Sequence, residues 1–211
     1  MYISDTQITT IQGMLEFLQP TVEDGLFDSV VLVNSIIRCT KDDIELLLVN
    51  PDGNGVFGFY PKLNASTQAS GAHALIGRAN KAMRCKGGFA IIDTQSEQKT
   101  FAAARTSNDK TAFMVSNRNA FTTGSGIRWH TTCYGDATSL NMYTYGYDMI
   151  MNYANDRTIL NKIPVVGVYG STDYFTTAFA RSCVQFAENG LQMIGGKKYG
   201  CYGVIAILDE E

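Results

Sequence analysis

The sequence predicts an α+β protein that is mainly antiparallel β-sheet, with a sandwich or barrel-like core and two helices. Short runs of β-branched and aromatic residues alternate with tight turns, most densely between residues 163 and 208. Two segments, 6–19 and 72–85, space their apolar residues by three and four, as one face of a helix does. Because 211 residues can bury a substantial core, we expect one β-rich domain over residues 1–211.

The first predicted helix covers Thr6–Gln19. Its apolar residues share one helical face: Ile8, Ile11, Leu15 and Leu18. Ser4 or Asp5 is placed to cap its first N–H groups, and Pro20 ends it because proline has no N–H to donate. Such a helix packs on the core, or it serves as a docking arm, residues 1–20, against a neighbouring subunit.

Three strands follow and form a predicted antiparallel meander. They cover Val30–Arg38, Ile44–Val49 and Val56–Tyr60, and the turn residues of Thr40–Asp43 and Pro51–Gly55 separate them. The second predicted helix, Ala72–Cys85, comes next and ends at Gly87 and Gly88. Further strands are predicted beyond it at Phe89–Asp93, Thr100–Arg105 and Thr111–Ser116.

The C-terminal stretch reads as a run of short strands joined by turns. Val165–Tyr169 is rich in β-branched residues, and Asn189-Gly190 favours a hairpin because both residues tolerate positive φ. Gly195–Lys198 predicts a second turn. Tyr202–Leu208 is apolar at both alternating sets of positions, which is typical of a central strand that is covered on both faces.

The charge of the chain is low. Charged residues make up 18% of the sequence, below the roughly 25% of typical soluble domains, so we expect part of the surface to lie against copies of the chain or other subunits. The net charge is −3, which argues against a nucleic-acid-binding face. No segment has a signal-peptide pattern or approaches the roughly 20 apolar residues of a membrane span, so no membrane contact is expected.

The sequence indicates no enzyme, no cofactor and no metal. Its five cysteines lie far apart and are odd in number, which favours reduced thiols made in a cytoplasm: Cys39, Cys85, Cys133, Cys183 and Cys201. No nucleophile motif is present, and we expect no catalytic residue. A small hydrolase stays open as an alternative, and it needs Cys85 or Cys133 within hydrogen-bond reach of His130 or His73.

A tyrosine-rich segment between residues 117 and 155 is the candidate recognition surface. Rigid amphipathic rings among small polar residues suit adaptable binding, for example of glycans, and the candidates are Trp129, His130, Tyr143, Tyr145 and Tyr147. Two other interpretations remain, since alternating tyrosines also stabilise a sheet by cross-strand stacking and a tryptophan is often buried.

The chain's ending is similar to that of a class of viral proteins. Ile163–Tyr169, Cys183–Phe186, Ile194–Tyr199 and Gly203–Leu208 resemble the ending of some virion surface and structural proteins of tailed bacteriophages. The resemblance covers about 45 residues and implies a β-rich, often oligomeric protein of the virion that is made in the host cytoplasm. It carries over no catalytic residue, because such proteins are structural or adhesive.

These observations lead to one expected function and two alternatives. The resemblance and the low charge favour a structural component of a bacteriophage particle, such as a capsid decoration, a neck or tail protein, or a fibre. Its expected partners are copies of itself and other virion proteins. The first alternative is a glycan-binding module that contacts the host surface, and the second is the small hydrolase.

Overall fold

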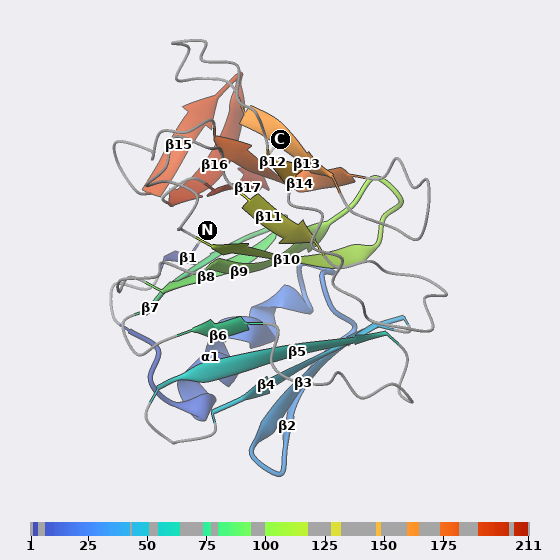
Figure 1. Cartoon of the computed structure of the whole chain (residues 1–211), viewed down its shortest axis with the longest axis vertical. Coiled ribbons are helices and arrows are strands. Elements are labelled where there is room, and N and C mark those ends of the chain that lie inside the picture. The colour runs from blue at the N-terminus through green and yellow to red at the C-terminus, as the bar shows by residue number, and fades with distance from the viewer. Residues whose placement is uncertain are drawn as a thin grey trace.

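The computed structural model describes residues 2–3, 7–42, 44–50, 55–63, 74–76, 80–93, 100–117, 128–131, 147–148, 160–164, 174–181, 190–202 and 205–210. These residues form three antiparallel sheets that stack along the long axis of the molecule, with a helix between two of them (Figure 1). The expected α+β class with mostly antiparallel sheet is confirmed. The expected barrel-like core is not confirmed, because none of these sheets is a closed barrel.

The first sheet contains the predicted meander, but it has five strands where three were predicted. Its order is β2-β3-β4-β5-β6, and its strands are β2 (Ser29–Val33), β3 (Ile36–Lys41), β4 (Ile44–Val49), β5 (Phe57–Leu63) and β6 (Ala74–Ile76). The single strand predicted over Val30–Arg38 is wrong, since this segment forms the β2–β3 hairpin. Asn34 and Ser35 take φ of 50° and 63° and reverse the chain between two apolar runs.

The first helix, α1 (Ile11–Leu18), is shorter than predicted. Thr10, rather than Ser4 or Asp5, is the N-cap, and its hydroxyl accepts a hydrogen bond from the Gly13 N–H at 3.0 Å. Ile8 stays outside the helix because the Asn80 side-chain amide bonds both its N–H and its C=O. A short 3₁₀ turn, Gln19–Thr21, carries Pro20 and ends the helix as expected.

The middle sheet has the order β1-β7-β8-β9-β10-β11-β12. Its strands are β1 (Tyr2–Ile3), β7 (Asn80–Cys85), β8 (Gly88–Asp93), β9 (Thr100–Arg105), β10 (Thr111–Asn117), β11 (Arg128–Thr131) and β12 (Tyr147–Asp148). The strands predicted from residue 89 to 116 are confirmed as β8, β9 and β10. The second helix, predicted over Ala72–Cys85, is wrong, because this segment contributes β6 and β7.

Burial on two sides explains why the residues of β7 form a strand. Ala82 belongs to the core on one face of the middle sheet, whereas Met83 and Cys85 belong to the core on the other. Only a strand presents neighbouring residues to opposite faces, so this tertiary burial outweighs the helical preference of alanine and methionine. Gly87 and Gly88, predicted to end a helix, instead lie where β7 turns back into β8.

The third sheet has the order β13-β14-β17-β16-β15. Its strands are β13 (Leu160–Pro164), β14 (Tyr174–Arg181), β15 (Gly190–Ile194), β16 (Lys197–Tyr202) and β17 (Ile205–Glu210). The predicted central strand is confirmed as β17, which is buried from Ile205 to Asp209 between β14 and β16. Gly195 and Gly196, with φ of 58° and 82°, form the turn predicted between β15 and β16. The strand predicted at Val165–Tyr169 lies outside the described residues.

The two faces of the middle sheet differ in side-chain size. The face toward α1 and the first sheet carries mostly large residues, among them Phe89, Ile91, Phe101 and Phe113. The face toward the third sheet is lined mainly by small ones, including Ala90, Ala102, Ala104 and Ala112. Small residues let the two sheets approach closely, and hydrogen bonds join them: the Thr177 hydroxyl donates to the Gly87 carbonyl at 2.6 Å.

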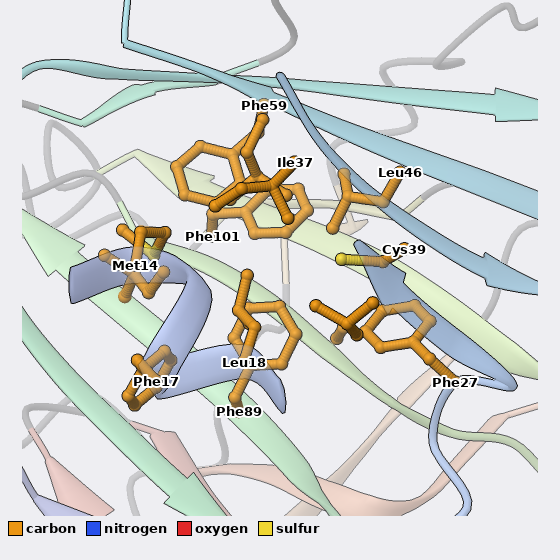
Figure 2. Packing of buried hydrophobic residues seen from close by; sticks show 14 of the residues in the cluster. Met14, Phe17, Leu18, Phe27, Ile37, Cys39, Leu46, Phe59, Phe89 and Phe101 are labelled. Carbon is orange, nitrogen blue, oxygen red and sulfur yellow. The ribbon is translucent and has the colours of Figure 1, made fainter. Parts of the chain in front are cut away.

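The aromatic core forms a continuous cluster under α1. Phe101 lies at its centre, with its ring centroid 4.3 Å from that of Phe59, 5.9 Å from Phe113 and 6.2 Å from Phe89. Figure 2 shows the α1 side chains, Leu18 among them, reaching into the space between these rings and the strands of the first sheet. The helix therefore fills the gap between two sheets and fixes how they lie relative to one another.

Candidate assembly surface

The β2–β3 hairpin exposes apolar side chains at its end. Val31 is 45% exposed, Leu32 37% and Val33 44%, although all three lie in a regular strand. The hairpin projects from the first sheet at one end of the molecule (Figure 1), so both of its faces meet solvent near the turn. We call Ser29–Ile36 the hairpin tip; it contains no charged residue.

The base of this hairpin is held by polar contacts. The Ser29 and Thr40 hydroxyls are hydrogen-bonded at 2.8 Å, and Lys41 pairs with Asp28 at 2.9 Å. The Lys41 ammonium and the Asp42 backbone N–H hydrogen-bond the Asp28 carboxylate and lower its pKa. Asp28 and Lys41 therefore lie at the base of the hairpin, whereas the exposed side chains of Val31, Leu32 and Val33 near the turn are apolar.

A second exposed apolar strand lies at the other end of the molecule. β15 is an edge strand of the third sheet, and it exposes Leu191 (47%) and Met193 (67%). Figure 1 shows β15 and β2 at opposite ends of the long axis. This edge also lies next to an ion pair, since Lys198 pairs with Glu210 at 3.3 Å just beyond the β15–β16 turn.

Sequence reasoning missed the hairpin tip because it placed Val31–Val33 inside one long strand. The available signal was Asn34-Ser35, a polar pair that interrupts an otherwise apolar run and suits a two-residue turn. Whether such a run is exposed depends on which other segments cover it, and that is not readable from the run itself.

The predicted recognition residues are only partly placed. Trp129 on β11 and Tyr147 on β12 are cross-strand partners at the edge of the middle sheet. His130 is the next residue of β11 and pairs with Val115 of β10. Tyr143 and Tyr145 lie outside the described residues. The structure thus brings two of the five candidates together, from positions 18 residues apart.

The cysteines and histidines of the hydrolase alternative are separated where the structure describes them. Cys85 is on β7 and His130 on β11, and three strands lie between them. At about 4.8 Å per strand spacing, the two backbones are roughly 19 Å apart, far beyond hydrogen-bond reach. Burial raises the pKa of the Cys85 thiol to about 12, which disfavours the nucleophilic thiolate. Cys133 and His73 lie outside the described residues.

The other described thiols are also buried. Cys39 and Cys201 form no disulfide and are fully buried, and burial raises the pKa of Cys39 well above its ordinary value. Within the described part of the chain, no three of the histidines, cysteines and carboxylates gather as metal ligands would. Nor is any described helix both long enough and apolar enough to cross a bilayer.

A polar cleft of about 280 Å³ lies where the segment after α1 meets the β7–β8 turn and the end of β17. Carboxylates and cations both line it, and they are Glu23, Asp24, Arg84, Lys86, Asp209 and Glu210. Burial raises the pKa of Asp24 against the opposing effect of Arg84 and Lys86. Arg84 donates to the Phe17 carbonyl and lies 5.6 Å from the centroid of the Phe17 ring. The cleft is therefore a junction at which Arg84 ties α1 to β7.

The chain was compared with family models, with curated proteins and with solved structures. No family model, no curated protein and no solved structure matches the chain. The functional interpretation consequently rests on the sequence and on the surface chemistry of the described residues, of which the uncharged hairpin tip is the most distinctive part.

Proposed function

We propose that this protein is a structural component of a bacteriophage particle that acts through self-association and contacts with other virion subunits. The observation that carries the proposal is the hairpin tip, in which the edge strand β2 exposes Val31, Leu32 and Val33 to solvent. Its role as a capsid decoration, a neck or tail protein, or a fibre follows from the resemblance of the chain's ending to bacteriophage virion proteins.

The proposal is supported by the sequence of β2, which lacks the residues that usually prevent an edge strand from pairing with another chain. Edge strands of monomeric proteins are commonly blocked by a charged side chain, a proline or a bulge, because their free N–H and C=O groups attract other strands. β2 has the sequence Ser-Val-Val-Leu-Val and contains none of the blocking residues. Burying exposed apolar surface is favourable by about 25 cal/mol per Å², so association of this edge is favoured.

A lysine in the strand is expected to prevent this association. Val31→Lys places an ammonium group in the apolar edge, and we expect self-association to weaken at least tenfold, or about 1.4 kcal/mol. Sedimentation velocity over a concentration series measures the effect. The matched control is Val22→Lys, which makes the same change at a 37% exposed residue that is not part of the hairpin and should associate as the wild type does. A wild-type chain that stays monomeric at every concentration contradicts the proposal.

A glycan-binding module remains the second candidate, and the pairing of Trp129 with Tyr147 favours it. Their backbones are register partners on the last two strands of the sheet, and aromatic residues are a residue type that stacks against sugar rings. If this function is correct, the wild type binds at least one ligand on a glycan array, and Trp129→Ala weakens that binding at least tenfold. Val22→Lys should leave the binding unchanged. An array without any bound glycan rejects the candidate.

A further inference from the structure

We infer that two copies of the chain pair through β2 in antiparallel orientation, with Val31 on the two-fold axis. This inference rests on the proposed self-association and specifies its geometry. Each copy contributes the same strand, so the contact is isologous and closes as a dimer. The five-stranded sheets of the two copies then join into one continuous sheet through β2.

The hairpin turn determines which backbone groups of β2 are free. Val33 and Ile36 are register partners across a two-residue turn with positive φ at both positions, which makes them a hydrogen-bonded pair. Hydrogen-bonded and non-hydrogen-bonded pairs alternate along an antiparallel ladder, so Val31 and Ser29 also direct their backbone groups toward β3. The N–H and C=O groups of Val30 and Leu32 therefore point to the open edge.

These free groups limit the possible registers between two copies. An antiparallel partner must present its own outward groups at the matching position. The hydrogen-bonded pair nearest the two-fold axis can therefore be Val30 with Val30, Val30 with Leu32, or Leu32 with Leu32. Pairing Val30 with Leu32 occurs twice by symmetry and engages every outward group of both strands. It also overlaps all five residues of β2, which leaves Val31 opposite Val31 and Ser29 opposite Val33.

The side chains around this contact are compatible with the same register. Val31 meets its own copy, and cross-strand pairs of β-branched residues stabilise a sheet. The nearest charge on the neighbouring strand is Arg38, the register partner of Val31 on β3. Arg38 is paired with Glu45 at 3.3 Å, so two copies bring together two neutral ion pairs rather than two uncompensated cations.

The second copy is the occupant that satisfies all of these conditions at once. It offers an extended strand with outward groups at the required spacing, apolar side chains and no charge in the tip. The contact is small, since five residues a side fall well short of the roughly 20–30 residues of a stable interface. We therefore expect a reversible dimer with a dissociation constant of about 1 μM or weaker, which the local concentration in a particle would reinforce.

Cysteine cross-linking tests the register directly. Val31→Cys places two thiols at a non-hydrogen-bonded pair with Cα atoms about 4.5 Å apart, within the range that a disulfide bridges. At about 100 μM protein with oxidised glutathione, we expect a covalent dimer on a non-reducing gel. Val33→Cys places its two thiols about 14 Å apart and should give no covalent dimer. Wild type under the same oxidant controls for the native thiols.

A mixture gives a second, independent result. Chains with Ser29→Cys and chains with Val33→Cys should each stay uncross-linked alone but cross-link to one another, because the register places residue 29 opposite residue 33. The register is wrong if Val33→Cys alone forms as much covalent dimer as Val31→Cys. It is also wrong if neither the Val31→Cys chain nor the mixture forms a covalent dimer. Should the wild type still associate in sedimentation, only the inferred geometry fails. A monomeric wild type would overturn the proposed function as well.

Discussion

Replacing Phe101 with alanine should lower the free energy of unfolding by about 3–5 kcal/mol. Phe101 is fully buried on β9, and its ring stacks on Phe59 at 4.3 Å and neighbours those of Phe89 and Phe113. Truncation removes these contacts and leaves a cavity between α1 and two sheets. Because the cavity walls come from three separate elements, they cannot easily collapse to fill it.

Urea unfolding followed by circular dichroism measures this loss. The control is Leu191→Ala on the exposed edge β15, where truncation should change the free energy of unfolding by no more than about 0.5 kcal/mol. If Phe101→Ala costs less than about 1.5 kcal/mol, the aromatic cluster is not the main core that the packing describes.

Replacing Gly88 with alanine should cost about 3 kcal/mol or more. An added methyl group would lie 2.2 Å from the Ala103 carbonyl oxygen and 2.9 Å from the Ala104 Cα, and both are backbone atoms of the paired strand β9. Gly88 also has φ of +155°, which L-residues rarely adopt. The clash can be relieved only by separating β8 from β9 at the centre of the molecule.

A second glycine separates the clash from the conformational cost. Gly190→Ala makes the same change at φ of +136°, with nothing within 4 Å of the added methyl group. We expect it to cost about 1–2 kcal/mol from conformation alone, measured by the same urea titration. Equal losses for the two variants would show that the close approach of β8 and β9 is unimportant.

Self-association through β2 would leave most of the molecule available for other contacts. The β15 edge lies at the opposite end of the long axis and exposes Leu191 and Met193 (Figure 1). A dimer joined at β2 therefore presents two such edges, one at each of its ends. This arrangement suits a subunit that connects several neighbours in a particle.

Much of the β-structure was predictable from local patterns. The leucine-rich run Ile44–Val49 and the mostly apolar run Phe89–Asp93 gave strands close to those observed, and the Gly195-Gly196 turn was placed correctly. These signals are local because turn chemistry and side-chain periodicity act over a few residues. The strand predicted near the C-terminus was also correctly assigned a central position, because apolar residues at both alternating positions require cover on two faces.

Other features were settled only by tertiary contacts. Asn80–Cys85 is part of a segment with helical spacing, Ala72–Cys85, but its position between two cores makes it a strand. The helix begins at Ile11 rather than Thr6, because Asn80, 72 residues away, bonds the backbone of Ile8. Exposure of the hairpin tip likewise depends on which strands lie beside β2. Local sequence states what each segment prefers, whereas the choice among preferences follows from burial and hydrogen bonds to distant residues, which only the folded chain brings together.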